Sequence, residues 1–80
     1  MVATAYILIT VAHGTARKVY DLLSSIPGVV QVNAISGPYD IIALLQGADF
    51  NAIGNIIINK IQPIDGIERT ITCNVIEFEQ

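Results

Sequence analysis

The stretch VYDLLSSIPGV, residues 19–29, recurs in pattern as IINKIQPIDGI, residues 57–67. In both stretches apolar side chains follow the spacing of one helix face, and an apolar-x-Gly-apolar sequence comes after them. The alignment pairs Val19, Leu23, Ile26, Gly28 and Val29 with Ile57, Ile61, Ile64, Gly66 and Ile67. Because proline and glycine end helices, each stretch predicts a helix that leads into a strand.

Four apolar segments flank these two helices and predict strands. Ala3 to Ala12 and Tyr39 to Gln46 are apolar with little alternation, as is typical of strands covered on both faces. The two remaining segments are Val29 to Ile35, which alternates, and Ile67 to Phe78. The last of these has polar residues at every second position, namely Glu68, Thr70, Thr72 and Asn74.

Thr15 and Asp49 are good N-caps for the two helices. The second helix is expected to end at Pro63 and to bury one stripe, formed by Phe50, Ile53, Ile57 and Ile61. The order βαββαβ predicts an α+β, ferredoxin-like domain over residues 1–80. In that fold a four-stranded antiparallel sheet carries both helices on one face, with the first and third strands in its centre.

The composition predicts self-association. Of the 80 residues, 52% are hydrophobic and 14% are charged, which is more apolar surface than one small core can hide. One face of the sheet would be open to water in a monomer. We expect Tyr6, Leu8, Ile42 and Leu44 to lie on that face, which a second copy would cover sheet against sheet.

Several function classes are disfavoured. Four Lys and Arg residues and a net charge of −3 offer no cationic surface for nucleic acid. The apolar run from Ala5 to Ala12 is too short to span a membrane, and the single cysteine, Cys73, indicates no disulfide framework, so the expected location is cytoplasmic. The lone His13 has no second ligand at metal-binding spacing. No catalytic set can be assembled, and neither a metal nor a cofactor is expected.

One turn combines residues that could bind a ligand. In Ser36-Gly37-Pro38-Tyr39-Asp40 a carboxylate stands at the entrance of an apolar central strand. Two interpretations of Asp40 remain open. It could be a turn acid satisfied by backbone N–H groups, or a partly desolvated carboxylate that holds a cation.

The Gly37-x-Tyr39-Asp40 turn is followed by an apolar strand, a helix and Gly66-Ile67-x-x-Thr70-x-Thr72. In this order the chain resembles the effector-binding domain of the Lrp/AsnC transcription regulators, also called the RAM module. The resemblance implies dimers with facing sheets, rings of dimers, and amino-acid effectors bound between dimers. Met1 leads directly into the first strand, so the chain looks like a stand-alone module that could join full-length Lrp/AsnC relatives.

The resemblance also implies a ligand site formed by Ser36, Gly37, Tyr39, Asp40, Thr70 and Thr72. Asp40 would accept the ammonium of an amino acid, and backbone N–H groups near Gly37 would approach its carboxylate, since glycine has no Cβ. The hydroxyls of Thr70 and Thr72 would complete the site from one face of a strand. The alternative is a ferredoxin-like subunit-interaction module without a small-molecule ligand.

Overall fold

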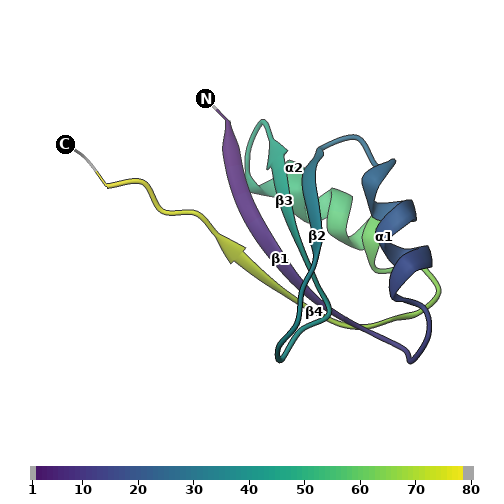
Figure 1. Cartoon of the computed structure of the whole chain (residues 1–80). Helices are drawn as coiled ribbons and strands as arrows, with labels where there is room; N and C mark the ends of the chain where they lie inside the picture. Colours follow the sequence, from purple (N-terminus) through teal and green to yellow (C-terminus); the bar gives the residue numbers. More distant parts are fainter. Residues whose placement is uncertain (1, 79–80) are drawn as a thin grey trace.

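The computed structural model describes residues 2–78. In chain order the elements are β1 (Ala3–Val11), α1 (Ala16–Ser24), β2 (Val29–Ala34), β3 (Ile41–Gly47), α2 (Phe50–Ile56), its π-helical continuation η1 (Ile57–Ile61) and β4 (Ile67–Asn74). The strands form one antiparallel sheet in the order β2-β3-β1-β4. The predicted βαββαβ order and the central position of the first and third strands are therefore confirmed. Figure 1 shows both helices on one side of the sheet.

The repeated helix exits form matching turns. Gly28 and Gly66 have φ values of +95° and +107°, a conformation that glycine adopts without steric cost. After each glycine the next N–H donates to the carbonyl three residues back, from Val29 to Ile26 at 3.1 Å and from Ile67 to Ile64 at 3.3 Å. Each glycine carbonyl also accepts a hydrogen bond from a central strand or its end. The repeat thus fixes the same helix-to-strand corner twice.

The core lies between the helices and one face of the sheet. Ala5, Ile7 and Ile9 of β1 are 0% exposed, and three alternate residues of β3 are buried in the same way. Two α1 residues, one β2 residue and three residues of the second helix complete this core, namely Val19, Leu23, Val32, Ile53, Ile57 and Ile61. The alternation along β1 and β3 means that their intervening side chains point away from the helices.

Asp49 caps the second helix as predicted, and its carboxylate accepts a hydrogen bond from the Ala52 N–H at 2.7 Å. Its buried isoleucines are spaced by four residues, more than the 3.6 residues of an α-helical turn. The wider π turn, in which the Gln62 N–H donates to the Ile57 carbonyl at 2.8 Å, brings Ile61 back onto the buried face. Phe50 was wrongly expected in the buried stripe. It is 45% exposed and lines a cavity at the end of the sheet.

Element ends account for the other differences from prediction. The last strand ends at Asn74 instead of Phe78, because its partner β1 begins at Ala3 and the last backbone hydrogen bond between them joins Val75 N–H to the Thr4 carbonyl. Thr15 precedes α1, but its hydroxyl donates to the Ala12 carbonyl at 2.7 Å and does not cap the helix. Among residues 2–78 no helix is long and apolar enough to cross a membrane.

Candidate functional site

The turn that joins β2 to β3 presents the first group of candidate residues. Ser36, Gly37 and Pro38 are exposed, and Tyr39 and Asp40 are half-buried just before β3 begins. A Cβ atom added to Gly37 would meet no atom within 4 Å. Its φ of +151° is a conformation that other residues rarely adopt. Backbone conformation, and not packing within the chain, therefore explains the glycine.

Asp40 is anchored to the adjacent central strand. Its Oδ2 atom accepts a hydrogen bond from the Val11 N–H at 2.9 Å, and its own N–H donates to the Ile9 carbonyl at 2.9 Å. Its carbonyl accepts from the Ile35 N–H across the turn, also at 2.9 Å. The carboxylate therefore has a structural role through one oxygen and a fixed orientation. The two interpretations of Asp40 do not exclude each other, because a carboxylate has a second oxygen that can accept.

The two threonines lie on β4, at the edge of the sheet. Thr70 pairs with Ile9 and Thr72 pairs with Ile7, so both threonines are on the side of the sheet that carries the helices. Thr70 is half-buried, and its Oγ1 accepts a hydrogen bond from Gln62 Nε2 at 3.3 Å. It borders a hollow of about 370 Å³ with Gln62, Ile67, Glu68 and Arg69. Thr72 lies farther along β4, in a groove beside α2.

Strand β1 separates the turn from the threonines. Asp40 is bonded to Ile9 on one side of β1, and Thr70 pairs with Ile9 on the other side. Adjacent strands lie about 4.8 Å apart, so the two groups are about 10 Å apart at the same end of the sheet. One chain thus holds the two groups of candidate residues on either side of one strand. Thr72 is one step farther from Asp40 than Thr70 is.

The face of the sheet away from the helices holds the four residues expected there. The register pairs Tyr6 with Leu44 and Leu8 with Ile42, and neither pair belongs to the buried core. Tyr6 is 43% exposed, and the other three are half-buried. Gln31 and Asn33 of β2 border this patch on one side. We name this surface, formed by Tyr6, Leu8, Ile42, Leu44 and Ile71, the open face.

Sequence reasoning missed several of these neighbours. Ile71 and Cys73 of β4 pair with Leu8 and Tyr6, so they extend the open face to the edge strand. Their alternation with Thr70 and Thr72 could have placed them on the opposite face. Gln62 was also missed as a partner of Thr70. No signal in the sequence links these two residues, because they meet only when η1 returns to the start of β4.

The described residues hold no group of three or more His, Cys, Asp or Glu side chains that could bind a metal ion. His13 and Cys73 are both exposed. The acidic pair Asp65 and Glu68 faces solvent, and Asp65 lies 3.5 Å from the Lys18 ammonium.

The chain thus combines the βαββαβ order with an exposed turn between β2 and β3 and an apolar sheet face. Residues 4–78 match the Lrp/AsnC ligand binding domain. The chain belongs to this family, as its sequence resemblance predicted. An uncharacterized HTH-type transcriptional regulator of Pyrococcus abyssi is 33% identical over 72 residues, which are 86% of this chain and 48% of the regulator. The chain thus spans about half the length of the curated regulators it matches.

Solved structures of the same fold include chains of similar length and longer regulators. A protein of Thermus thermophilus superposes with a TM-score of 0.91 and 26% identity, covering 98% of both chains. Escherichia coli AsnC gives a TM-score of 0.88 and 26% identity over 95% of this chain and 52% of its own. A Neisseria meningitidis regulator solved with L-Met shares the fold, with a TM-score of 0.84 and 18% identity over 94% of this chain and 50% of that chain.

One similarity involves an enzyme. Homocitrate synthase of Sulfurisphaera tokodaii is 42% identical over 55 residues, which are 69% of this chain and only 12% of the enzyme. The shared part is therefore a small fraction of that enzyme. The Pyrococcus relative is a transcriptional regulator by its name, and the matched family model is a ligand binding domain.

Proposed function

We propose that this chain is an amino-acid-binding RAM module that assembles through its open face and modulates amino-acid-responsive transcription together with Lrp/AsnC-type regulators. The observation that carries the proposal is the match of residues 4–78 to the family's ligand binding domain. The anchored Asp40 carboxylate gives that match a chemical basis.

Asp40 is suited to hold the ammonium group of an amino acid. Because the Val11 N–H engages Oδ2, the carboxylate keeps one orientation when the ligand arrives, which lowers the entropic cost of binding. The ammonium then binds Oδ1 through a charge-assisted hydrogen bond. Backbone N–H groups of the exposed Ser36–Gly37 segment are available to the ligand carboxylate, whereas Pro38 has no N–H to donate.

The second half of the binding site comes from Thr70 and its hollow. This hollow includes Gln62, Glu68 and Arg69, whose side chains present both donors and acceptors. Within one chain β1 keeps the hollow about 10 Å from Asp40. The half-sites are therefore completed by neighbouring copies, as in the rings of dimers that the family resemblance implies. A ligand between copies couples amino-acid concentration to assembly.

Dimer formation uses the open face. Its centre is apolar, and Gln31 and Asn33 at one side supply a polar border, the arrangement of stable interfaces. A second copy laid sheet against sheet removes Tyr6, Leu8, Ile42 and Leu44 from water. Mixed assemblies with longer Lrp/AsnC regulators would use the same face. Such mixing, in the cytoplasm, would change how many DNA-binding units each assembly carries.

A thermal-shift screen over the twenty amino acids tests the ligand. A ligand that binds only the folded protein raises its stability by about 2.7 kcal/mol at one hundred times Kd. We expect at least one amino acid to raise the melting temperature at millimolar concentration, and Asp40→Asn to lose the shift. The absence of any shift over all twenty amino acids would contradict amino-acid binding.

A second candidate function is an interaction module without a small-molecule ligand. The open face favours it independently, because an apolar sheet face needs a partner whether or not a ligand binds. The same screen separates the two functions: assembly without any amino-acid response supports the interaction module. Purified protein alone should not retard duplex DNA in either case, since its net charge is −3.

A further inference from the structure

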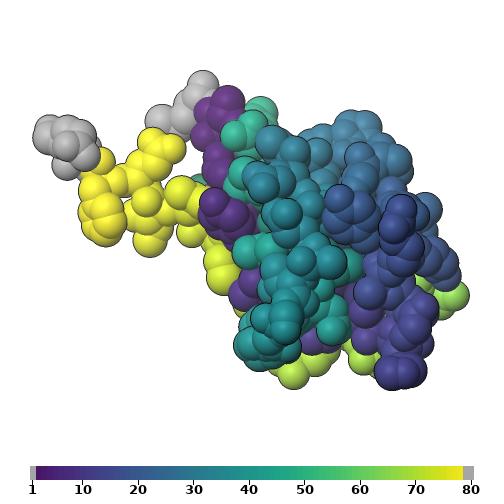
Figure 2. All heavy atoms as spheres, in the orientation of Figure 1, coloured from purple at the N-terminus to yellow at the C-terminus, as the bar shows by residue number. Residues whose placement is uncertain are grey.

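The C-terminal segment Val75–Phe78, which we name the arm, leaves the sheet after β4. Ile76 is 78% exposed and Phe78 is 85% exposed, the two highest values among the exposed large hydrophobic side chains of residues 2–78. Figure 1 shows this segment extending away from the helices, and Figure 2 shows it projecting from the body of the protein. Val75 is half-buried against its own chain, whereas Ile76 and Phe78 gain little burial from it. Their burial therefore requires another molecule.

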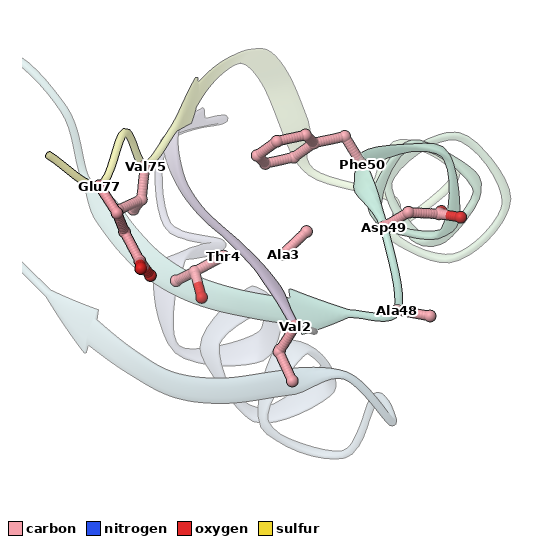
Figure 3. A pocket seen from close by; sticks show the side chains of 8 residues that line it. All are labelled: Val2, Ala3, Thr4, Ala48, Asp49, Phe50, Val75 and Glu77. Carbon is pink, nitrogen blue, oxygen red and sulfur yellow. The ribbon is translucent and has the colours of Figure 1, made fainter. Parts of the chain in front are cut away.

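An apolar cavity lies at the base of the arm. Its volume is about 280 Å³, and it lies between the start of β1, the start of α2 and the arm itself. The cavity is lined by Val2, Ala3, Thr4, Ala48, Asp49, Phe50, Val75 and Glu77. In Figure 3 the Phe50 ring borders one side of this space, and Val75 and Glu77 border another. Two of the lining residues are acidic, Asp49 and Glu77. Asp49 caps α2, whereas Glu77 has no capping role.

We propose that the arm exchanges between two copies of this chain, and that Phe78 of each copy enters the cavity of the other. The cavity is walled by the base of the same arm, at Val75 and Glu77. In a two-fold symmetric dimer the same surface of each copy meets its equivalent. If the two arms meet in this way, the end of each arm lies beside the cavity of the partner. The proposal rests on the dimer of the proposed function and adds to it a second contact, away from the centre of the open face.

The structure favours a second copy as the occupant. The arm and the cavity continue the open face: Thr4 lines the cavity, and Tyr6, two residues along β1, lies on that face. The arm is the direct extension of β4, whose Cys73 pairs with Tyr6. Two copies with facing sheets therefore bring both arms and both cavities to the border of one interface. An aromatic side chain in an apolar pocket is the usual form of an interface anchor.

Disulfide cross-linking tests the exchange directly. In the full chain with Cys73→Ser, the pair Ala48→Cys and Phe78→Cys places one thiol at the cavity and one on the arm. We expect mild oxidation to give a covalent dimer on a non-reducing gel. Leu22→Cys with Phe78→Cys is the matched control and should remain uncross-linked, because Leu22 is exposed on α1, away from the cavity and the open face. An intramolecular disulfide in the test pair would show that the arm folds back, and would overturn the proposal.

The dimer dissociation constant provides a second measurement. Ile76→Ser with Phe78→Ser should raise this constant by more than about tenfold, because two apolar anchors are lost from each copy. Leu22→Ser, which removes an exposed apolar side chain of α1, should leave the constant unchanged. If the parent is a dimer, but the cysteine pair forms no cross-link and the serine variant keeps the parent's dissociation constant, the arm exchange is wrong and the open-face dimer stands. A monomeric parent would overturn both the arm and the open-face dimer.

Discussion

The two faces of the central strands β1 and β3 are both apolar, but they differ in burial. On the face that carries the helices, Ala5, Ile7 and Ile9 are 0% exposed, while on the other face Tyr6 and Leu8 retain accessible surface. The same contrast separates the buried residues of β3 from their neighbours on the open face. Both faces of the sheet are therefore apolar, but the two helices bury only one of them. Under the proposed function, a second copy supplies the second cover.

A charge on the helix-covered face should have the largest effect. Ile7→Asp places a carboxylate among the buried residues of the sheet, where it has no partner. Such a change costs more than about 4 kcal/mol, a large part of a stability of about 5–15 kcal/mol. We expect this variant to lose the cooperative urea unfolding transition, which circular dichroism monitors. A native urea transition for this variant would show that the described core is wrong.

The same charge on the open face should act on assembly. Leu44→Asp places a carboxylate at the centre of the patch, and we expect the dimer to be lost, with aggregated or unfolded protein at high concentration. Leu22→Asp, on an exposed position of α1 on the other side of the sheet, should retain the dimer. Size-exclusion chromatography with light scattering distinguishes the two variants. A Leu44→Asp dimer as stable as that of the parent would place the interface elsewhere.

Ligand binding at the turn should change by a smaller amount. Asp40→Asn keeps an oxygen acceptor for the Val11 N–H and removes the charge, so it should weaken amino-acid binding by about 1.5–3 kcal/mol, or ten- to a hundredfold. Asp40→Ala loses both roles and should also lower the free energy of unfolding by about 1 kcal/mol. Thr70→Val should cost binding about 0.5–1.5 kcal/mol. Calorimetry measures these affinities. Equal binding by the parent and by Asp40→Asn would place the ligand elsewhere.

Two glycines extend the comparison between covered and open surfaces. Gly66 has φ +107°, and an added Cβ would lie 3.0 Å from the Cβ of Thr15, so Gly66→Ala should destabilise the fold by about 1–3 kcal/mol. Gly54 lies in α2, where an added Cβ meets nothing within 4 Å. Gly54→Ala should therefore stabilise the fold by up to about 1 kcal/mol. Chemical denaturation checks both signs. A stabilising Gly66→Ala would contradict the tight corner between Gly66 and α1.

Much of the fold could be predicted because local patterns agree with the tertiary structure. The apolar-x-Gly-apolar exits became two equivalent corners, and Asp49 caps its helix as its residue type favours. The ends of β4 and the π turn of η1 could not be predicted in this way. The end of β4 depends on where β1 begins, and the π turn depends on the fit of Ile61 to the core. Both are properties of packing between distant segments.

The candidate site could be predicted only in part. The short turn motif located Asp40 at the entrance of a central strand, but its bond to Val11 joins residues that are distant in the sequence. The separation of Asp40 from Thr70 by β1 follows from the strand order, which the predicted fold already contained. The pairing of Gln62 with Thr70 follows from the path of η1 and had no sequence signal. Site geometry thus required the register of the sheet.

Sedimentation equilibrium of the unmodified chain tests the central claim most directly, namely that a second copy covers the open face. The monomer mass is 8.6 kDa. At micromolar concentration we expect twice this mass or a higher even multiple, with no detectable monomer. A folded, monodisperse species of 8.6 kDa under these conditions would contradict the account, because the open face would then be stable in water.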